Sequence, residues 1–264
     1  MYPILFRIPL GAYTLPVPGY GAMLAIGFSI GLYLVVRRAK IERLDPEEFL
    51  NMATYVILTA LIGSRLFHVF IEKPSFYLAN PLEIPKIWKG GYTFYGGMIP
   101  AALVLWWYLK KHKMPVLKSM DIFSPSLAIG ESFGRIGCFL AGCCHGKVCA
   151  YALFPLSYVP TNPESFSRPI GVPLYATQLW QSFGNFIVFL ILFWMQKRKK
   201  FDGQLLAGYF ILYPIVRITV EIFRGDDIRG FVIPGIISTS QFIGFWMMLL
   251  GIILWWRTSK HPIH

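Results

Sequence analysis

Long apolar runs alternate with short polar segments along the whole chain. The apolar runs are roughly 17 to 25 residues long, which is enough for a helix to cross a bilayer. They fall near residues 20–36, 49–70, 92–109, 121–143, 174–195, 204–223 and 233–256. The pattern predicts an all-α integral membrane protein, a bundle of about seven transmembrane helices.

Clusters of basic residues follow alternate apolar runs. They are Arg37, Arg38, Lys40 and Arg43; Lys110, Lys111, Lys113 and Lys118; Lys197, Arg198, Lys199 and Lys200; and Arg257 and Lys260. By the positive-inside rule these ends are cytoplasmic, so we expect the N-terminus outside and the C-terminus in the cytoplasm. The other side holds the Pro-rich loops 72–90 and 145–173, which we expect to form extracytoplasmic caps without long helices.

The composition supports a membrane location. Hydrophobic residues make up 55% of the 264 residues and charged residues 14%, which is too apolar for a soluble protein. A net charge of +12 would suggest nucleic acid in a soluble chain, but here the cations cluster at span ends and face anionic lipid headgroups. We expect no nucleic-acid partner, no removable signal peptide and a single domain over residues 1–264.

Ionisable residues lie deep inside three of the apolar runs, where each costs about 2.5 to 3.5 kcal/mol to insert. In the sixth run Tyr209, Tyr213, Arg217 and Glu221 recur every fourth residue, so a helix would align them on one face. Such residues either neutralise one another inside the bundle or serve a function.

The fourth and second runs add further charges. Glu131, Arg135 and Cys138 would share one stripe of a helix that is rich in glycine, and the second run contains Arg65. The formal charges of Arg65, Arg135 and Arg217 exceed those of Glu131 and Glu221. An anionic ligand such as a phospholipid headgroup would supply the missing charge, and arginine binds phosphate with two parallel hydrogen bonds.

The cysteines form the pattern C-x4-C-C-H-x3-C, which fits neither a standard zinc spacing nor a haem attachment motif. Because the predicted topology places them at the oxidising face, Cys149 could form a disulfide with Cys143 or Cys144. Cys138 could simply be a small packing residue. Near the third run, Gly90, Gly91, Gly96 and Gly97 could form an anion-binding concavity or a tight turn. Tyr20 could be an interfacial aromatic or a ligand.

The chain resembles the prolipoprotein diacylglyceryl transferase family over nearly its whole length. The segments that carry the resemblance are YGAMLAIGF, GSRLF, FYGG, GRIGCFLAGCCHG, TQLWQS, GYFILYPIVRITVEIFRGDD and STSQF. The family pattern Gly-Arg-x-Gly-Asn-Phe-x-Asn-Gly-Glu-x-x-Gly aligns without a gap with Gly134 to Gly146. Among the departures from the family, Tyr95 stands for a His, Cys138 for an Asn and Cys143 for a Glu.

The resemblance implies an enzyme of the bacterial plasma (inner) membrane, whose active site opens toward the extracytoplasmic leaflet. Its partners would be the lipid bilayer, phosphatidylglycerol and prolipoprotein signal peptides. The enzyme would transfer diacylglycerol to the thiol of a lipobox cysteine and release glycerol phosphate, with no metal or organic cofactor required.

The implied site residues fall into two groups. The catalytic group is Arg135, Arg217, Glu221 and Tyr95. The substrate-binding group is Arg135, Tyr20, Arg65, Tyr213, Glu131, Cys138, Gly96, Gly97, Gly142 and Gly146. Since a phenol with a pKa of about 10 is a poor base at neutral pH, either Glu221 accepts the thiol proton or no strong base is needed.

Other classes of function remain open. A transporter or binding protein for an anionic lipid or solute would use the same buried arginines, although the chain has no repeated halves of the kind that alternating access uses. A thiol-redox or metal protein would need its cysteines to react. A catalytically silent homologue is a further alternative.

Overall fold

A computed structural model describes residues 1–10, 13–86, 90–225, 230–233 and 237–262. The chain divides into two compact units. The first unit consists of Met1–Leu34 with Met120–His264, and the second is Val35–Ser119. The single domain predicted over residues 1–264 stays a prediction.

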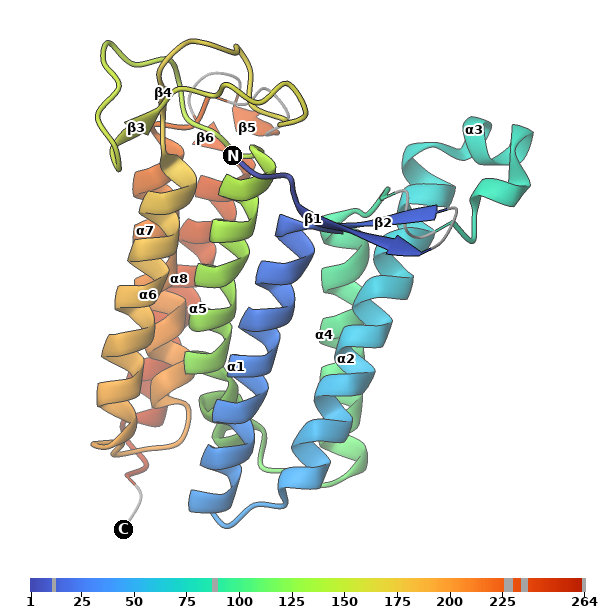
Figure 1. Cartoon of the computed structure of the whole chain (residues 1–264). Helices are drawn as coiled ribbons and strands as arrows, with labels where there is room; N and C mark the ends of the chain where they lie inside the picture. Colours follow the sequence, from blue (N-terminus) through green and yellow to red (C-terminus); the bar gives the residue numbers. More distant parts are fainter. Residues whose placement is uncertain (11–12, 87–89, 226–229, 234–236, 263–264) are drawn as a thin grey trace. The chain divides into compact units, whose positions relative to one another are not determined.

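Helices account for most of the described chain (Figure 1). The long helices are α1 (Gly19–Ile41), α2 (Pro46–Phe67), α4 (Phe94–Lys111), α5 (Val116–Ala141), α6 (Thr177–Gln196), α7 (Gln204–Glu221) and α8 (Thr239–Thr258). Each overlaps an apolar run of the sequence. The short helices are η1 (His68–Glu72), α3 (Pro74–Ala79) and η2 (Pro81–Glu83).

The strands form three small antiparallel pairs. They are β1 (Ile4–Leu10) with β2 (Tyr13–Pro18), β3 (Ser157–Tyr158) with β4 (Leu174–Tyr175), and β5 (Phe231–Ile233) with β6 (Ile237–Ser238). Between α5 and α6 the chain forms no helix, as predicted for the Pro-rich loop 145–173. Peptide bonds Phe154–Pro155 and Arg168–Pro169 in this loop are cis.

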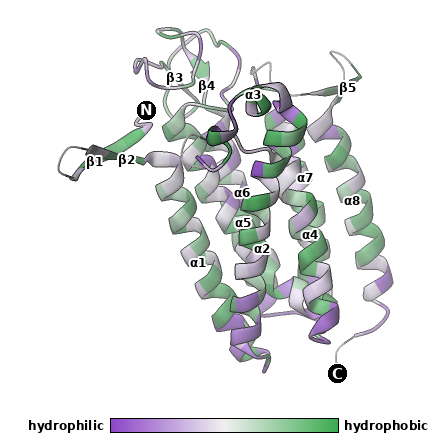
Figure 2. Ribbon diagram, turned by 90° about the vertical axis from the view of Figure 1, so that its right-hand side faces the viewer, coloured by the Kyte–Doolittle hydropathy of each residue, from purple (hydrophilic) through white to green (hydrophobic). Residues whose placement is uncertain are grey.

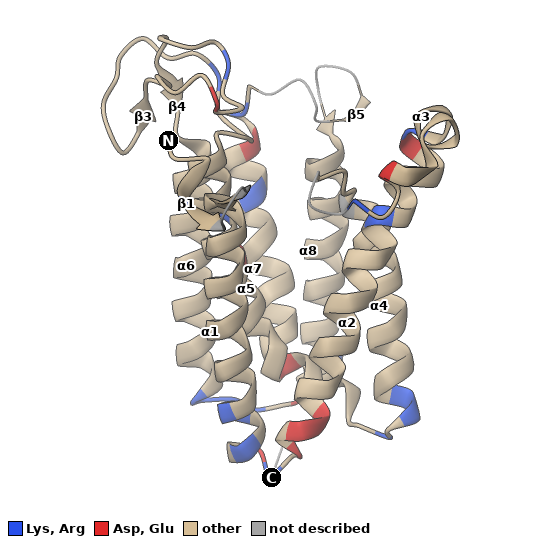
Figure 3. Cartoon of the chain, turned by 45° about the vertical axis from the view of Figure 1, so that its right-hand side comes forward, with Lys and Arg blue, Asp and Glu red and all other residues tan. Residues whose placement is uncertain are grey.

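Four helices in the described part of the chain are long and apolar enough to cross a membrane. They are Gly19–Ile41, Pro46–Glu72, Thr177–Gln196 and Thr239–Thr258. In Figure 2 the middle parts of the long helices are coloured mostly green or white, for hydrophobic or intermediate residues, and in Figure 3 Lys and Arg lie mainly at helix ends. The protein is therefore a helical membrane protein, whereas the predicted count of seven crossings and the predicted orientation stay predictions.

In the first unit, small residues allow the helices to approach closely. A Cβ atom on Gly27 of α1 would lie 3.0 Å from Cβ of Phe133 on α5, and one on Gly251 of α8 would lie 2.8 Å from Cβ of Phe210 on α7. The hydroxyl of Ser132 donates to the carbonyl of Ser182 at 2.9 Å, which joins α5 to α6. Because lipid supplies little driving force between helices, such close packing and interhelical hydrogen bonds hold the unit together.

In the second unit, α2 packs along α4. A Cβ atom on Gly96 would lie 2.2 Å from Cβ of Phe67, and one on Gly97 would lie 2.9 Å from the carbonyl oxygen of Ala60. The hydroxyl of Ser64 donates to the carbonyl of Thr93 at 2.8 Å. Gly96 and Gly97 therefore lie in the tightest part of this helix contact.

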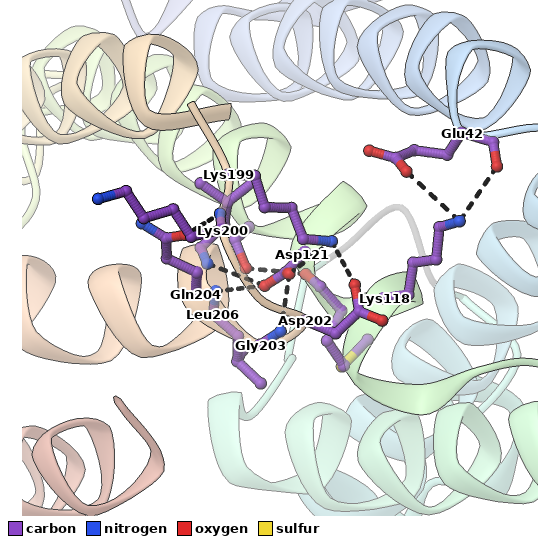
Figure 4. Close-up of polar contacts among 12 residues, drawn as sticks. Glu42, Lys118, Asp121, Lys199, Lys200, Asp202, Gly203, Gln204 and Leu206 are labelled. Atoms are coloured by element: carbon purple, nitrogen blue, oxygen red, sulfur yellow. Dashed lines mark hydrogen bonds and ion pairs between the residues drawn. The ribbon is translucent and has the colours of Figure 1, made fainter. Parts of the chain in front are cut away.

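A buried carboxylate fixes the start of α7. Asp121 on α5 accepts hydrogen bonds from the backbone N–H groups of Gly203 (2.8 Å), Leu205 (2.9 Å) and Leu206 (2.9 Å) (Figure 4). The first N–H groups of a helix have no partner inside the helix, so this carboxylate satisfies three of them. Gly203 has φ of +89°, a left-handed conformation that favours glycine.

Lys199 completes this network. Its Nζ lies 3.0 Å from Asp121 and 2.6 Å from Asp202. Burial disfavours the charged ammonium, but the hydrogen bond to Asp202 and the attraction of Asp121 outweigh that effect, so the pKa of Lys199 lies above its usual value. In the second unit, Lys118 makes a separate pair with Glu42 at 3.4 Å (Figure 4).

Replacing Asp121 tests this cap. We expect Asp121→Ala to lower the free energy of unfolding by about 2 kcal/mol, because three helix N–H groups and Lys199 lose their acceptor. Thermal unfolding of the detergent-purified protein measures the change. Asp202→Ala is the matched control, since it removes only a partly exposed partner of Lys199 and should cost less than about 1 kcal/mol. Equal losses in the two variants would contradict the assignment.

Candidate functional site

One face of α7 carries two phenols, a guanidinium and a carboxylate, as the sequence predicts. The rings of Tyr209 and Tyr213 stack with centroids 5.4 Å apart. One turn further on, Nη1 of Arg217 lies 2.7 Å from Oε2 of Glu221, and both side chains are buried. Nη2 of Arg217 donates to the hydroxyl of Ser240 on α8 at 2.8 Å.

Arg224, just beyond the end of α7, is a residue that sequence reasoning missed. It is buried, and its Nη1 lies 3.8 Å from the same oxygen of Glu221. One carboxylate therefore faces two guanidinium groups. The sequence contained a signal for this contact. Glu221 follows Arg217 by four residues and Arg224 follows Glu221 by three, and residues at these spacings are neighbours on a helix surface.

The predicted stripe on α5 adds Glu131, Arg135 and Cys138 to the same unit. The side-chain amide of Asn185 donates to Glu131 at 3.3 Å, and Glu131 interacts electrostatically with Arg135 and Arg217. The structure therefore brings the charged residues of α5 and α7 together, which the sequence alone could not establish.

Arg135 differs from the other arginines of this cluster. Within the part of the chain that the structure describes, its guanidinium makes no hydrogen bond and no ion pair, although Glu131, Tyr213, Cys138 and Cys144 are near enough to interact with its charge. A cation in this setting is costly without an anion in direct contact. Its five donor groups are free to bind a phosphate or carboxylate ligand.

Tyr20 lies beside this arginine. It belongs to the first turn of α1 and is 41% exposed. A Cβ atom on Gly137 would lie 3.0 Å from the ring of Tyr20, so the absence of a side chain at Gly137 lets the phenol lie against α5. The Tyr20 hydroxyl lies close enough to Arg135, Cys138 and Cys143 to interact with them electrostatically.

Three of the four cysteines lie together at the end of α5. The Sγ atoms of Cys138, Cys143 and Cys144 lie within 4.8 Å of one another, close enough to share a metal ion. All four cysteines are free thiols, so the disulfide considered between Cys149 and Cys143 or Cys144 is not formed in this structure. The thiol of Cys149 instead donates to the carbonyl of Tyr151 at 3.1 Å.

A polar face on α6 was also missed from the sequence. Its residues Gln178, Gln181, Ser182 and Asn185 are buried and follow at helical spacing. Asn185 reaches Glu131, and the amide of Gln178 donates to the carbonyl of Cys143 at 2.9 Å. The segment TQLWQSFGN contained this signal, because amide side chains three and four residues apart are unusual in an apolar helix.

Gly142 and Gly146, predicted to bind substrate, lie in tight backbone packing of the first unit. Gly142 has φ of +85°, and a Cβ atom there would lie 2.9 Å from the hydroxyl oxygen of Ser167. A Cβ atom on Gly146 would lie 2.5 Å from Cβ of Tyr175. Their predicted contact with substrate stays a prediction.

In the second unit, Arg65 binds backbone carbonyls. Its guanidinium donates to the carbonyls of Glu83 (2.8 Å), Ile84 (3.2 Å) and Gly91 (3.3 Å), and also to that of Gly90. These bonds hold the segment that follows α3 against the end of α2. A cavity of about 440 Å³ lies beside this network.

The other predicted residues of the second unit lie on α4. Tyr95 is 41% exposed in its first turn, and Gly96 and Gly97 follow it in the contact with α2. Substrate binding or catalysis by Arg65, Tyr95 and these glycines stays a prediction.

The first unit thus defines a class of protein: a helical membrane protein with an arginine-rich polar site among its helices. A family model described as prolipoprotein diacylglyceryl transferase matches residues 3–257. The chain is 34% identical to a phosphatidylglycerol–prolipoprotein diacylglyceryl transferase of Clostridium tetani, over 96% of each chain. It is 32% identical to the second such enzyme of Clostridium perfringens over 94% of each chain, and 31% identical to that of Finegoldia magna over 97% of each chain. The chain belongs to the prolipoprotein diacylglyceryl transferase family.

Replacing Glu221 tests the buried ion pair. We expect Glu221→Gln to lower the free energy of unfolding by about 3 to 5 kcal/mol, because it removes the carboxylate that directly contacts the buried guanidinium of Arg217. Thermal unfolding in detergent measures the loss. Glu164→Gln is the control: it breaks the 3.6 Å pair between Arg7 and Glu164, whose side chains are 58% and 57% exposed, and should cost less than about 1 kcal/mol. A Glu221→Gln variant as stable as this control would contradict the assignment.

Proposed function

We propose that this chain transfers the diacylglyceryl group of phosphatidylglycerol to the thiol of a lipobox cysteine in prolipoproteins, forming a thioether and releasing glycerol phosphate. Its family membership supports the reaction, and the relatives named above carry this activity in their names. Arg135 is the observation that carries the proposal, because a guanidinium without a hydrogen bond or ion pair among the described residues is suited to a phosphate.

We further propose that the chain crosses the bacterial plasma membrane seven times. Helices coincide with all the predicted spans, and the basic clusters at the ends of alternate spans favour a cytoplasmic C-terminus and an external N-terminus. Under this topology the site residues at the end of α5 and the loop between α5 and α6 face the extracytoplasmic leaflet. The site would then open toward the lipid and signal-peptide substrates on that side.

The reaction is a displacement at an sp3 carbon. The thiolate sulfur forms a bond to the glyceryl carbon, and the electron pair of the breaking C–O bond leaves with the phosphate. Because negative charge grows on the phosphate oxygens, Arg135 and Arg217 would bind them more strongly in the transition state than in the substrate. Preformed donors in a site that excludes water make this interaction effective.

The neighbouring residues would hold the phosphate clamp, which consists of Arg135 and Arg217, and the lipid headgroup in position. Glu221 fixes Arg217 through the 2.7 Å ion pair, and Glu131 would steady Arg135 through its charge. Tyr20 and Tyr213 would orient the headgroup. We propose that Arg65 also helps to orient the headgroup. Because its guanidinium already donates to backbone carbonyls of its own unit, it would do so indirectly, through the shape of the segment that it holds.

The fate of the thiol proton has two candidate explanations. Glu221 could accept it, but its carboxylate is buried between Arg217 and Arg224. Alternatively, the positive field of the arginines lowers the pKa of the incoming thiol so that no strong base is needed. The ion pairs around Glu221 favour the second explanation.

Binding or transport of an anionic lipid is a second candidate function, because it would use the same guanidinium of Arg135, which has no partner among the described residues. Movement of labelled phosphatidylglycerol across proteoliposomes that contain a lipobox peptide, without formation of the thioether, would favour it. Absence of both activities in folded protein would favour a catalytically silent homologue.

Arg135→Lys tests the phosphate clamp. We expect a loss of about a hundredfold or more in turnover, since a lysine keeps the charge but cannot bind two phosphate oxygens in parallel. The assay uses purified protein in phosphatidylglycerol micelles with a lipobox peptide and measures the diacylglyceryl thioether by mass. Arg7→Lys, at an exposed position, should keep full activity. Full activity in Arg135→Lys would exclude the clamp.

Two glycines of α5 offer a matched test of the position of Tyr20. An alanine methyl at Gly137 would lie 3.0 Å from the ring of Tyr20, whereas one at Gly130 has nothing within 4 Å. We expect Gly137→Ala to lower activity about tenfold or more by displacing the phenol from Arg135. Gly130→Ala should leave activity unchanged and raise helix stability by about 0.5 to 1 kcal/mol. Equal activities in the two variants would exclude a role for the position of Tyr20.

A further inference from the structure

We propose that Cys138, Cys143 and Cys144 form a zinc site whose fourth position takes the thiol of the substrate. This inference rests on the proposed transferase activity and deepens it, because it identifies what activates the thiol. The spacing of the cysteines in the sequence does not match a standard zinc motif. The tertiary structure nevertheless brings their three Sγ atoms within 4.8 Å of one another.

The separation of the sulfur atoms suits a tetrahedral metal. With Zn–S bonds of about 2.3 Å, sulfur ligands of a tetrahedral zinc lie about 3.8 Å apart. The three Sγ atoms would therefore need to close by about 1 Å or less, which rotation of the cysteine side chains can supply. Thiolate ligands also favour zinc or copper(I) over magnesium or calcium.

The backbone that carries the three cysteines is held by named contacts. The chain turns back at the end of α5 through Gly142 and Cys144, whose φ angles are +85° and +58°, and the N–H of Cys143 donates to the carbonyl of Cys138 at 3.1 Å. From α6, Thr177 donates to the carbonyl of Cys144 at 3.0 Å and Gln178 to that of Cys143 at 2.9 Å. A left-handed conformation at a residue other than glycine persists only where its surroundings enforce it.

The charges around the cluster also suit a metal–thiolate site. Three thiolates and one Zn²⁺ together carry a net charge of −1. Cys144 lies close enough to Arg135 and Arg224 to interact with their positive charges. Arg135, which has no hydrogen bond or ion pair among the described residues, would then lie near both the metal centre and the lipid phosphate. Buried metal–thiolate groups with net negative charge are stabilised by such cations.

Three protein ligands leave one coordination position open, as in catalytic zinc sites. Within the described residues, the group that could hold a metal consists of these three cysteines alone. The thiol of the lipobox cysteine would bind the fourth position and lose its proton to water on coordination, because a metal-bound thiol is deprotonated. The zinc-bound thiolate would attack the glyceryl carbon, and the C–O electron pair would leave with the phosphate. Zinc stays divalent throughout.

The first test measures metal binding on the full-length protein. We expect the wild type to bind about one Zn²⁺ per chain by elemental analysis, and Co²⁺ in its place to give a thiolate-to-cobalt charge-transfer band. Cys149→Ser, which changes the buried cysteine outside the cluster, should keep both. Replacement of Cys138, Cys143 and Cys144 by Ser should abolish both. Absence of a stoichiometric metal and of the band in wild-type protein would overturn the proposal without reference to any variant.

The second test uses the substrate as a ligand. A lipobox peptide should increase the cobalt–thiolate absorbance, whereas the same peptide with Ser in place of its Cys should not. Loss of the thioether product on chelation and its return with Zn²⁺ would complete the case. Product formed at full rate by metal-free protein would overturn the zinc site and leave the transferase intact. A peptide-dependent band in protein that forms no product would retain the zinc site and refute the transferase.

Discussion

A guanidinium placed among apolar helices needs an anion close by, and the first unit is arranged around that requirement. Arg217 meets it with Glu221, while Arg135 has no hydrogen bond or ion pair among the described residues. Since the bilayer core offers no water to solvate a cation, an anionic ligand would stabilise the second arrangement. The difference between these two arginines is the physical basis for the phosphate that we propose to bind at this site.

The surrounding helices position this pair of arginines through small and amide side chains. Gly137 lets Tyr20 lie against α5, and Asn185 of α6 holds the carboxylate of Glu131. Hydrogen bonds between helices and close glycine contacts replace the hydrophobic effect that would hold such helices in water. The polar site is therefore part of the packing between the helices.

The cysteine cluster would solve the chemical problem that the arginines leave open. Arginines would stabilise a departing phosphate and lower the pKa of an incoming thiol, but they do not themselves accept its proton. Both carboxylates of the site have other partners: Glu221 pairs with Arg217, and Glu131 accepts a hydrogen bond from Asn185. A metal that binds the incoming thiol would deprotonate it without a base, beside the arginine that we propose to bind the phosphate.

The sequence by itself determined the helices and the charged faces of α5 and α7, because an apolar run of membrane length and a repeat of every fourth residue depend on local geometry alone. It also determined the family, through the segment that contains Arg135. Only the tertiary structure decided that Glu131 of α5 lies near Arg217 of α7, that Asp121 caps α7 across the unit, and that three cysteines with no zinc spacing converge. These are contacts between residues distant in the chain or across a turn, and the positions of such side chains are set by packing rather than by any local pattern.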